Sequence, residues 1–554
     1  MNVHDSGASF IYRNRDMTSA VRHQIAGAEA TVYSSRCPGK ESANEDVAAI
    51  VPLSESSCVL IVADGMGGHA AGEVASSLAA RTVRESLAAE RDALDEFEQG
   101  HGGTTRKDIL RLMEASVQQA CSMVHNEGVK DESKRGMGTT LDALLILGSR
   151  GFIAHVGDAR IYLYRQGSVH RLTEDHSLIN ELLKRGRLTR EQIDKVQYKN
   201  AVTRAVGVYE SVEVDVFDFD LLPGDRNLLC SDGLSCYLDD PITLDIMTRE
   251  EIKEIPEAFI VLANEAGGKD NITAVVVRAL PAAAEDQQRR VQDVRQKLDA
   301  LRAIPLFKYL TYKGLVKVLN VTTTVTYEAG EVIFREDTRD DAFFVLLDGL
   351  VQLSRGGLPL ADLSAGAHFG EMAMVDKAPR SATATALVAA RALVIQRARF
   401  YELLRAEPVM AVKLTWSFIQ VLNTRLRMTS RELLAARETI EVLRRNQAGG
   451  VVAEVPAFDP GLAAVGALPV AVTDELIPGF LLTEQESGGT DPLLRVEGQG
   501  PPEDADERRG LDRSAPATQP DRPSVMAFQR RTQPDLAVLR GRLADDAHDD
   551  EEAP

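Results

Sequence analysis

Apolar runs in the first half of the chain repeatedly meet an aspartate at one end. Short runs of this kind, bounded by glycine or aspartate, are typical of buried strands. The runs are 59–63 before Asp64, 152–156 before Asp158, 228–231 before Asp232 and 272–277 after Asp270. A single Asp-Gly pair is compatible with an ordinary turn. Four strand-end aspartates in one segment instead predict a cluster of carboxylates.

Such a cluster indicates a metal centre. Carboxylates brought together repel one another and would be forced to protonate unless cations lay between them. No histidine or cysteine accompanies these aspartates in a ligand-like pattern. Ligand sets made only of oxygen select hard ions, so Mg²⁺ or Mn²⁺ is expected rather than zinc.

The remaining pattern predicts two folded regions of an α+β protein. Helical spacing at 70–90 and 106–127 alternates with the strand-like runs, and 174–206 reads as a helical insertion. Short β-rich runs punctuated by glycine, such as 332–334 and 351–353, predict a small barrel or jelly roll. The expected organisation is a mobile arm at 1–25, a first domain at 26–281, a helical linker at 282–303, a barrel domain at 304–425, a helix at 426–449 and a disordered acidic, proline-rich tail at 450–554.

Composition excludes several classes of protein. A formal net charge of -20 with only 5% aromatic residues argues against a nucleic-acid partner. Five cysteines without a CxxC pair indicate neither a zinc ribbon nor a disulfide framework. The chain has no apolar run long enough to span a membrane and no stretch like a signal peptide, so we expect a cytoplasmic protein without a membrane partner.

The residues around the aspartates resemble the type 2C family of metal-dependent serine/threonine protein phosphatases, in its bacterial form. The resemblance runs in the family's order over roughly residues 28 to 280 and implies a four-layer α/β/β/α sandwich. It rests on Asn44-Glu45-Asp46, Ala63-Asp64-Gly65-Met66-Gly67-Gly68-His69, Met137-Gly138-Thr139-Thr140, His155-Val156-Gly157-Asp158-Ala159-Arg160, Thr203-Arg204-Ala205-Val206-Gly207, Cys230-Ser231-Asp232-Gly233-Leu234 and Gly268-Lys269-Asp270-Asn271-Ile272-Thr273.

The resemblance also implies roles for individual residues. Metal binding falls to Asp46, Asp64, Gly65, Asp158, Asp232 and Asp270. Within this set Gly65 contributes its carbonyl, Asp46 acts through metal-bound water and Asp158 binds a third, looser ion. The implied reaction is attack of a metal-bridging hydroxide on phosphoserine or phosphothreonine, with Asp46, Asp64, Asp232 and Asp270 as its catalytic residues.

Two positions depart from the family pattern. Where an arginine usually binds the substrate phosphate this chain has Glu41, so either Arg36 or Lys40 takes its place or the affinity for substrate is low. Met66 stands where many eukaryotic members have a histidine proposed as general acid, and it cannot donate a proton. His69 lies past the ligand turn, which favours a structural role over an acid role.

A second set of residues predicts an anion-binding cassette in the barrel. Glu371 can accept hydrogen bonds from a ribose, Arg380 can pair with a phosphate, and the turn after Gly370 can present amides to the same anion. Over about 304–425 the chain resembles the cyclic nucleotide-binding domain. The resemblance implies that Glu371 holds the ribose and that Arg380 and Ser381 hold the cyclic phosphate of cyclic AMP or cyclic GMP. A barrel that keeps its shape without binding nucleotide is the alternative.

The sequence therefore favours a phosphatase acting on phosphoserine and phosphothreonine proteins, with Ser/Thr kinases as possible associates and a cyclic nucleotide as modulator. The competing hypothesis is a non-catalytic, nucleotide-sensing scaffold that binds phosphoproteins. Glu41 favours the scaffold, whereas the intact set of costly clustered aspartates favours the enzyme.

Overall fold

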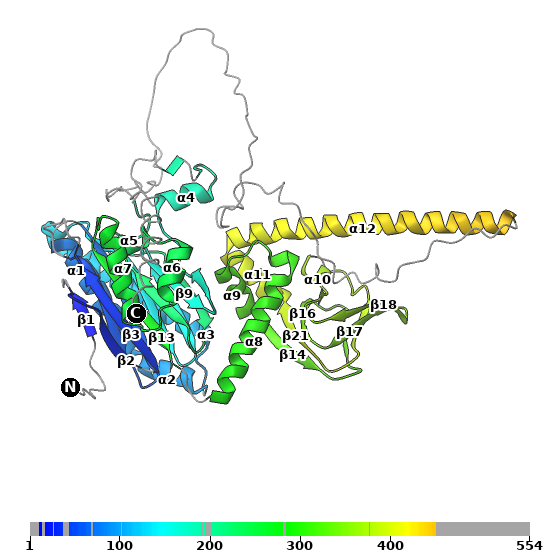
Figure 1. Ribbon diagram of the computed structural model, residues 1–554, viewed down its shortest axis with the longest axis horizontal. Helices are drawn as coiled ribbons and strands as arrows, with labels where there is room; N and C mark the ends of the chain where they lie inside the picture. Colours follow the sequence, from blue (N-terminus) through cyan, green and yellow to red (C-terminus); the bar gives the residue numbers. More distant parts are fainter. Residues whose placement is uncertain are drawn as a thin grey trace, which may run out of the picture.

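The computed structural model shows two folded bodies side by side, a sandwich of two sheets and a smaller barrel (Figure 1). It describes residues 10–13, 17–25, 27–36, 44–67, 70–100, 102–189, 192–193, 201–280, 284–375 and 377–449. Lys40, Glu41, His69 and the predicted tail at 450–554 lie outside the described residues.

The sandwich consists of two antiparallel sheets. The first has the order β1 (Phe10–Arg13), β4 (Asp46–Pro52), β5 (Ser57–Met66), β7 (Leu141–Leu147), β8 (Arg150–Val156) and β11 (Asp215–Asp220), with β6 (Gly138–Thr139) beside β5. The second has the order β10 (Ser168–Arg171), β9 (Arg160–Arg165), β12 (Arg226–Cys230), β13 (Ile272–Ala279), β3 (Ala28–Ser35) and β2 (Val21–Ile25).

Alternation along the strands builds four layers. In β4, Ala48 and Ile50 enter the buried cluster between the two sheets, whereas Val47 and Ala49 enter the cluster beneath the helices. The helices over the first sheet are α1 (Ala70–Ala89), α2 (Arg91–Gln99) and α3 (Arg106–Lys130). Those over the second are α5 (Asp232–Ser235), α6 (Asp240–Met247) and α7 (Glu254–Glu265). The α/β/β/α arrangement expected from the sequence is confirmed.

Two local predictions differ from the structure. Part of the expected mobile arm forms strands, because β1 pairs with β4 and β2 pairs with β3. The expected helical insertion contains only one short α-helix in its described part, α4 (Leu178–Lys184). Gly186 has a positive φ of 63° and its amide bonds the Leu183 carbonyl, which ends the helix.

The second body is a barrel of two four-stranded sheets, as the glycine-punctuated runs predicted. One sheet has the order β14 (Thr322–Tyr327), β21 (Ala390–Gln396), β16 (Ala342–Asp348) and β19 (His368–Phe369). The other has the order β15 (Val332–Phe334), β20 (Thr383–Ala386), β17 (Leu350–Arg355) and β18 (Leu358–Ser364). A separate apolar cluster fills the space between them.

Helices flank the barrel on both sides in sequence. Before it come α8 (Ala284–Ala303), the 3₁₀ turn η3 (Pro305–Phe307) and α9 (Tyr312–Asn320). Within and after it come α10 (Met372–Val375), α11 (Arg397–Ala406) and the long α12 (Pro408–Gly449). Among the described residues, no helix is both long and apolar enough to cross a membrane.

Helix α9 joins the two bodies through specific contacts. Arg106 donates to the Asn320 carbonyl at 2.7 Å, and the Asn320 side chain donates to the Asp218 carbonyl at 2.7 Å. Arg165 donates to the Tyr312 hydroxyl at 2.6 Å. One buried apolar cluster continues from the sandwich into the barrel. The two bodies therefore share a packed seam.

Candidate metal centre and nucleotide pocket

The antiparallel pairing of β4 with β5 places Asp46 directly opposite Asp64. Asp232 opens α5 immediately after β12, and Asp270 precedes β13, the strand paired with β12. A Cβ built on Gly233 would lie 3.4 Å from the Asp270 Cβ, so these two turns are in contact. The same end of the two sheets therefore gathers the four aspartates that the family resemblance implied as catalytic residues.

Asp46 is the most buried of the four, with 1% of its surface exposed. Its Oδ2 accepts a hydrogen bond from Ser231 Oγ at 2.8 Å, whereas its Oδ1 is buried and has no hydrogen-bond partner among the described residues. Burial raises the pKa of Asp46 to about 7; the charges of Asp270 and Asp232 also raise it, and hydrogen bonds from Thr273 and Ser231 oppose the rise. A nearby cation would favour the ionised form of Asp46 and lower its pKa again.

The backbone around Asp64 is held tightly. Thr140 Oγ1 accepts from the Asp64 amide at 3.1 Å, and Thr139 Oγ1 donates to the Asp64 carbonyl at 2.9 Å. A Cβ on Gly65 would lie 2.2 Å from the Gly72 carbonyl oxygen, so only glycine fits at this position. The Gly65 carbonyl therefore lies at the end of β5, in backbone that Gly72 holds closely.

Asp158 lies in a turn that a histidine supports. The Gly157 amide donates to His176 Nδ1 at 3.1 Å, and His176 Nε2 lies 3.0 Å from an Arg204 nitrogen and 3.4 Å from Asp215 Oδ1. Burial lowers the pKa of His176. His176 and Ser231 were not predicted as site residues: the first fell in the expected helical insertion, and the second has a hydroxyl whose target only the paired sheets reveal.

The atoms available as metal ligands at this end of the sheets suit a hard cation. All are oxygens, and the unpartnered Asp46 Oδ1 provides a buried atom that needs a donor or an ion. Within the described part of the chain, however, no three Asp, Glu, His or Cys side chains already form a cage that could hold an ion. Bringing the carboxylates to coordination distance therefore requires side-chain adjustment.

The residues predicted to contact phosphate are only partly described. Arg36 is exposed at the end of β3, next to the second sheet's ligand edge. Lys40 and Glu41 lie outside the described residues, so their placement stays a prediction. Met66 is in β5 with 6% of its surface exposed and has no proton to give.

In the barrel, all four predicted nucleotide-binding residues line one pocket of about 320 Å³, namely Gly370, Glu371, Arg380 and Ser381. Phe334, Leu353 and Leu363 supply part of its apolar wall. Gly370 has a φ of 78°, and a Cβ there would lie 2.6 Å from Arg380 Nη1. The glycine thus lets the arginine approach the turn.

Arg380 is buried and already engaged. It donates to Asp340 Oδ2 at 2.7 Å, to the Ala342 carbonyl at 2.6 Å and to the Gly370 carbonyl at 3.2 Å. Its guanidinium lies 4.2 Å from the centroid of the Phe334 ring. Its Nε is buried without a hydrogen-bond partner among the described residues. A bound anion would therefore share this guanidinium with Asp340.

Comparisons with known proteins agree with both halves. Residues 36–275 match the family model Protein phosphatase 2C, and residues 324–407 match the model Cyclic nucleotide-binding domain. The chain is 37% identical over 235 residues to Serine/threonine phosphatase stp of Listeria welshimeri, covering 42% of this chain and 89% of that protein. The chain belongs to the protein phosphatase 2C family. It is a protein serine/threonine phosphatase that also carries a cyclic nucleotide-binding domain, which confirms the enzyme over the scaffold.

Further relatives are similar over the same half of the chain. Protein phosphatase PhpP of Streptococcus pneumoniae is 38% identical over 221 residues, which is 40% of this chain and 85% of that protein. A solved structure of the S. agalactiae serine/threonine phosphatase is 32% identical and covers 46% of this chain and 99% of that one, with a TM-score of 0.41.

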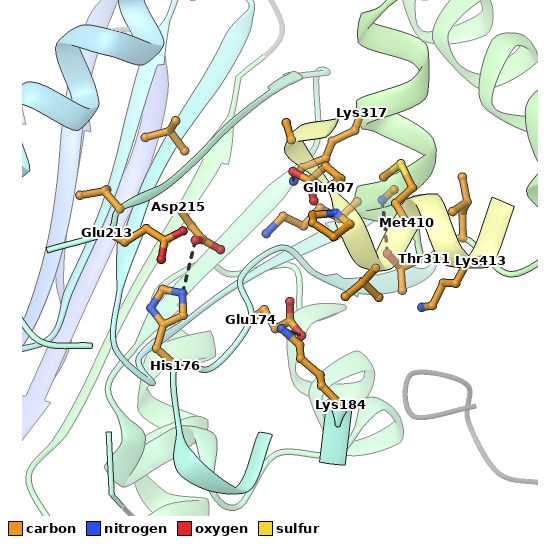
Figure 2. A pocket seen from close by; sticks show the side chains of 18 of the residues that line it. Glu174, His176, Lys184, Glu213, Asp215, Thr311, Lys317, Glu407, Met410 and Lys413 are labelled. Carbon is orange, nitrogen blue, oxygen red and sulfur yellow. Dashed lines mark hydrogen bonds and ion pairs between the residues drawn. The ribbon is translucent and has the colours of Figure 1, made fainter. Parts of the chain in front are cut away.

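A second cavity of about 490 Å³ lies at the seam between the phosphatase and nucleotide-binding domains (Figure 2). His176, Asp215 and Glu174 line it from the phosphatase domain, while Lys317 and Glu407 line it from the other side. Lys317 forms an ion pair with Glu407, which lies where α11 meets α12. The histidine behind the Asp158 turn therefore faces the helices that follow the nucleotide barrel.

Proposed function

We propose that the phosphatase domain uses Mn²⁺ or Mg²⁺ held by Asp64, Asp232 and Asp270, with the Gly65 carbonyl as a further ligand. Asp46 would contribute through bound water, and Asp158 would hold a looser ion. The ions would supply positive charge for the phosphoryl group and an activated water. The observation that carries this proposal is the burial of Asp46 opposite Asp64, beside the charges of Asp232 and Asp270.

The chain's own residues would fix the positions of these oxygens. Ser231 orients Asp46 through one carboxylate oxygen and leaves the other available. Thr139 and Thr140 restrict the Asp64 backbone by hydrogen bonds to its carbonyl and amide. Such support outside the ligand set preserves ligand orientation.

The direct test is hydrolysis of a phosphothreonine peptide with and without Mn²⁺. Asp64→Asn is expected to lower kcat by at least about 1000-fold, because it removes a ligand charge from the centre. Asp362→Asn, an exposed carboxylate on β18, is the matched control and is expected to retain wild-type activity. Full activity in Asp64→Asn, or activity in wild type that survives chelation of metal, would refute the metal assignment.

We further propose that a cyclic nucleotide binds the barrel pocket and modulates the phosphatase. The convergence of Gly370, Glu371, Arg380 and Ser381 on one pocket supports this proposal. The cyclic phosphate would bind Arg380, whose buried Nε has an unused donor, and the ribose would bind Glu371. The mostly apolar wall would cover the base.

Contacts offer a route from this pocket to the phosphatase domain. On α11, Arg397 donates to the Ala373 carbonyl at 3.0 Å and Tyr401 donates to the Met374 carbonyl at 3.0 Å. These carbonyls belong to α10, next to the nucleotide residues. Helix α11 then leads to Glu407 at the seam cavity. Nucleotide binding that moves α10 would therefore displace one wall of that cavity.

Calorimetric titration with cyclic AMP and cyclic GMP tests the binding step. Wild type is expected to bind at least one of them, and Arg380→Ala is expected to weaken that binding by about 100-fold, because a desolvated ion pair with the phosphate is lost. Arg339→Ala, an exposed arginine outside the pocket, is the control. Absence of heat with wild type for both nucleotides would leave the barrel without the proposed ligand.

A further inference from the structure

Helix α12 has two different faces at its start. Met410, Leu414 and Ser417 are buried against the chain's own core. Val412 and Ile419, on the other side of the same turns, are 45% and 54% exposed. A helix that already buries one apolar face has no internal need for a second.

Apolar residues on the exposed face recur with a seven-residue period, with threonine or alanine at three of the positions. With Val412 as the first a position, the a and d residues are Val412, Thr415, Ile419, Leu422, Leu426, Thr429, Leu433, Ala436, Ile440 and Leu443. A repeat averaging about 3.5 residues per turn keeps these side chains on one side of a supercoiled helix, which is the pattern of a coiled coil.

The row of a and d residues, called the heptad stripe below, lies away from the rest of the described chain. Leu426 is 67% exposed and Leu433 is 54% exposed, and residues 429–438 are all exposed. In Figure 1 the C-terminal part of α12 extends beyond the barrel, with none of the described elements beside its last turns. A row of exposed leucines and isoleucines of this length marks an interaction site.

We propose that α12 pairs with α12 of a second copy of this chain in a parallel, in-register, two-stranded coiled coil. The β-branched Val412, Ile419 and Ile440 at a, combined with leucine at d at 422 and 443, favour two strands. Thr415 and Thr429 at d weaken the apolar contact of the heptad stripe but do not interrupt it. The Thr415 hydroxyl donates a hydrogen bond to the Ala411 carbonyl of its own helix at 2.8 Å.

Charge complementarity selects both the partner and the direction. Glu432 is at g and Arg437 is at e of the next heptad, so two parallel copies bring the glutamate of each chain to the arginine of the other. Antiparallel pairing would instead place e against e, where Arg437 and Arg444 lie. The Glu432–Arg437 pair therefore favours parallel pairing of two copies of α12.

Mass measurement of the full chain by light scattering tests the proposal. Wild type at micromolar concentration is expected at about twice 60.3 kDa. Leu426→Glu combined with Leu433→Glu is expected to give the monomer mass, because a dimer would bury four glutamates, two from each chain, between the heptad stripes. Leu434→Glu is the matched control. Leu434 is 59% exposed but lies at b, outside the heptad stripe, so this variant is expected to stay dimeric.

Two pairs of further variants test direction and register. Leu433→Cys is expected to form an intermolecular disulfide on mild oxidation, whereas Ala435→Cys at c is not. Glu432→Arg is expected to raise the dimer dissociation constant about tenfold, and adding Arg437→Glu is expected to restore it. Phosphatase activity equal to wild type shows that each variant is folded.

Three results would overturn the proposal. The first is a wild-type monomer, which would mean that another part of the chain or another protein covers the heptad stripe. The second is a dimer that survives both Leu→Glu changes. The third is equal cross-linking at 433 and 435. None of these outcomes bears on the metal or nucleotide assignments, which the activity and calorimetry measure separately.

Discussion

At the scale of single residues, the fold leaves no room for a side chain at Gly65. Gly65→Ala is expected to lower the free energy of unfolding by about 2 kcal/mol and to reduce activity at least about 100-fold, because its Cβ would overlap the Gly72 carbonyl. Gly103→Ala, whose Cβ would meet nothing within 4 Å, is expected to change stability by less than about 0.5 kcal/mol. Chemical denaturation and peptide hydrolysis check both. Equal effects of the two substitutions would contradict the close packing at Gly65.

The aspartates that carry the chemistry could be predicted from the sequence because each follows or precedes an apolar run. Their supporting groups could not. Ser231 contacts Asp46 only because the two sheets pack face to face, and His176 reaches Gly157 from a segment without a regular pattern. Arg380 was predicted to be a phosphate ligand, but its pairing with Asp340 depends on a contact across 40 residues that spacing does not encode.

At the scale of elements, the long apolar runs correctly predicted strands. β5, β12 and β13 contain the apolar runs read from the sequence, since strands buried on both faces have little alternation to misread. The edge strands β1 and β2 were missed because their residues are mixed and only partly buried, and only pairing with β4 and β3 makes them strands. Sheet order is likewise a tertiary property.

The seam between domains carries a pH-sensitive contact. His170 on β10 stacks on Tyr312 of α9 with ring centroids 3.9 Å apart. Burial, together with the charges of Arg302 and Arg165, lowers the pKa of His170 to about 4. Between that value and the ordinary pKa of 6.5, the unfolded chain binds a proton that the folded chain does not. Stability therefore falls as pH falls through this window.

We expect His170 to account for a loss of about 2 kcal/mol in the free energy of unfolding between pH 7 and pH 5. His170→Gln should lose correspondingly less over the same interval. Denaturant unfolding at the two pH values measures the difference. An identical pH dependence in wild type and His170→Gln would show that the stack does not exclude the proton.

At the scale of the whole molecule, the two domains share a core and a cavity rather than a free linker. Asn320 hydrogen-bonds Arg106 and the Asp218 backbone, and Glu407 and His176 face the same space. This arrangement could not be read from the sequence, which showed only two separate site patterns and a charged helix between them. The cytoplasmic location stays a prediction.

Control of the phosphatase by nucleotide is the central claim, and linkage makes it measurable. If a nucleotide changes the affinity for substrate, substrate changes the affinity for nucleotide by the same factor. The route through α10, α11 and Glu407 predicts that occupancy of the barrel pocket reaches the Asp158 turn. Differential contacts of this kind typically shift an equilibrium about 5- to 150-fold.

The most direct measurement is the initial rate of phosphothreonine-peptide hydrolysis with Mn²⁺ during titration of the nucleotide that wild type binds. We predict a saturable change of at least about fivefold in kcat/KM for wild type, and a flat response in Arg380→Ala with its basal rate unchanged. A wild-type rate that stays constant at nucleotide concentrations shown by calorimetry to saturate the pocket would contradict the account.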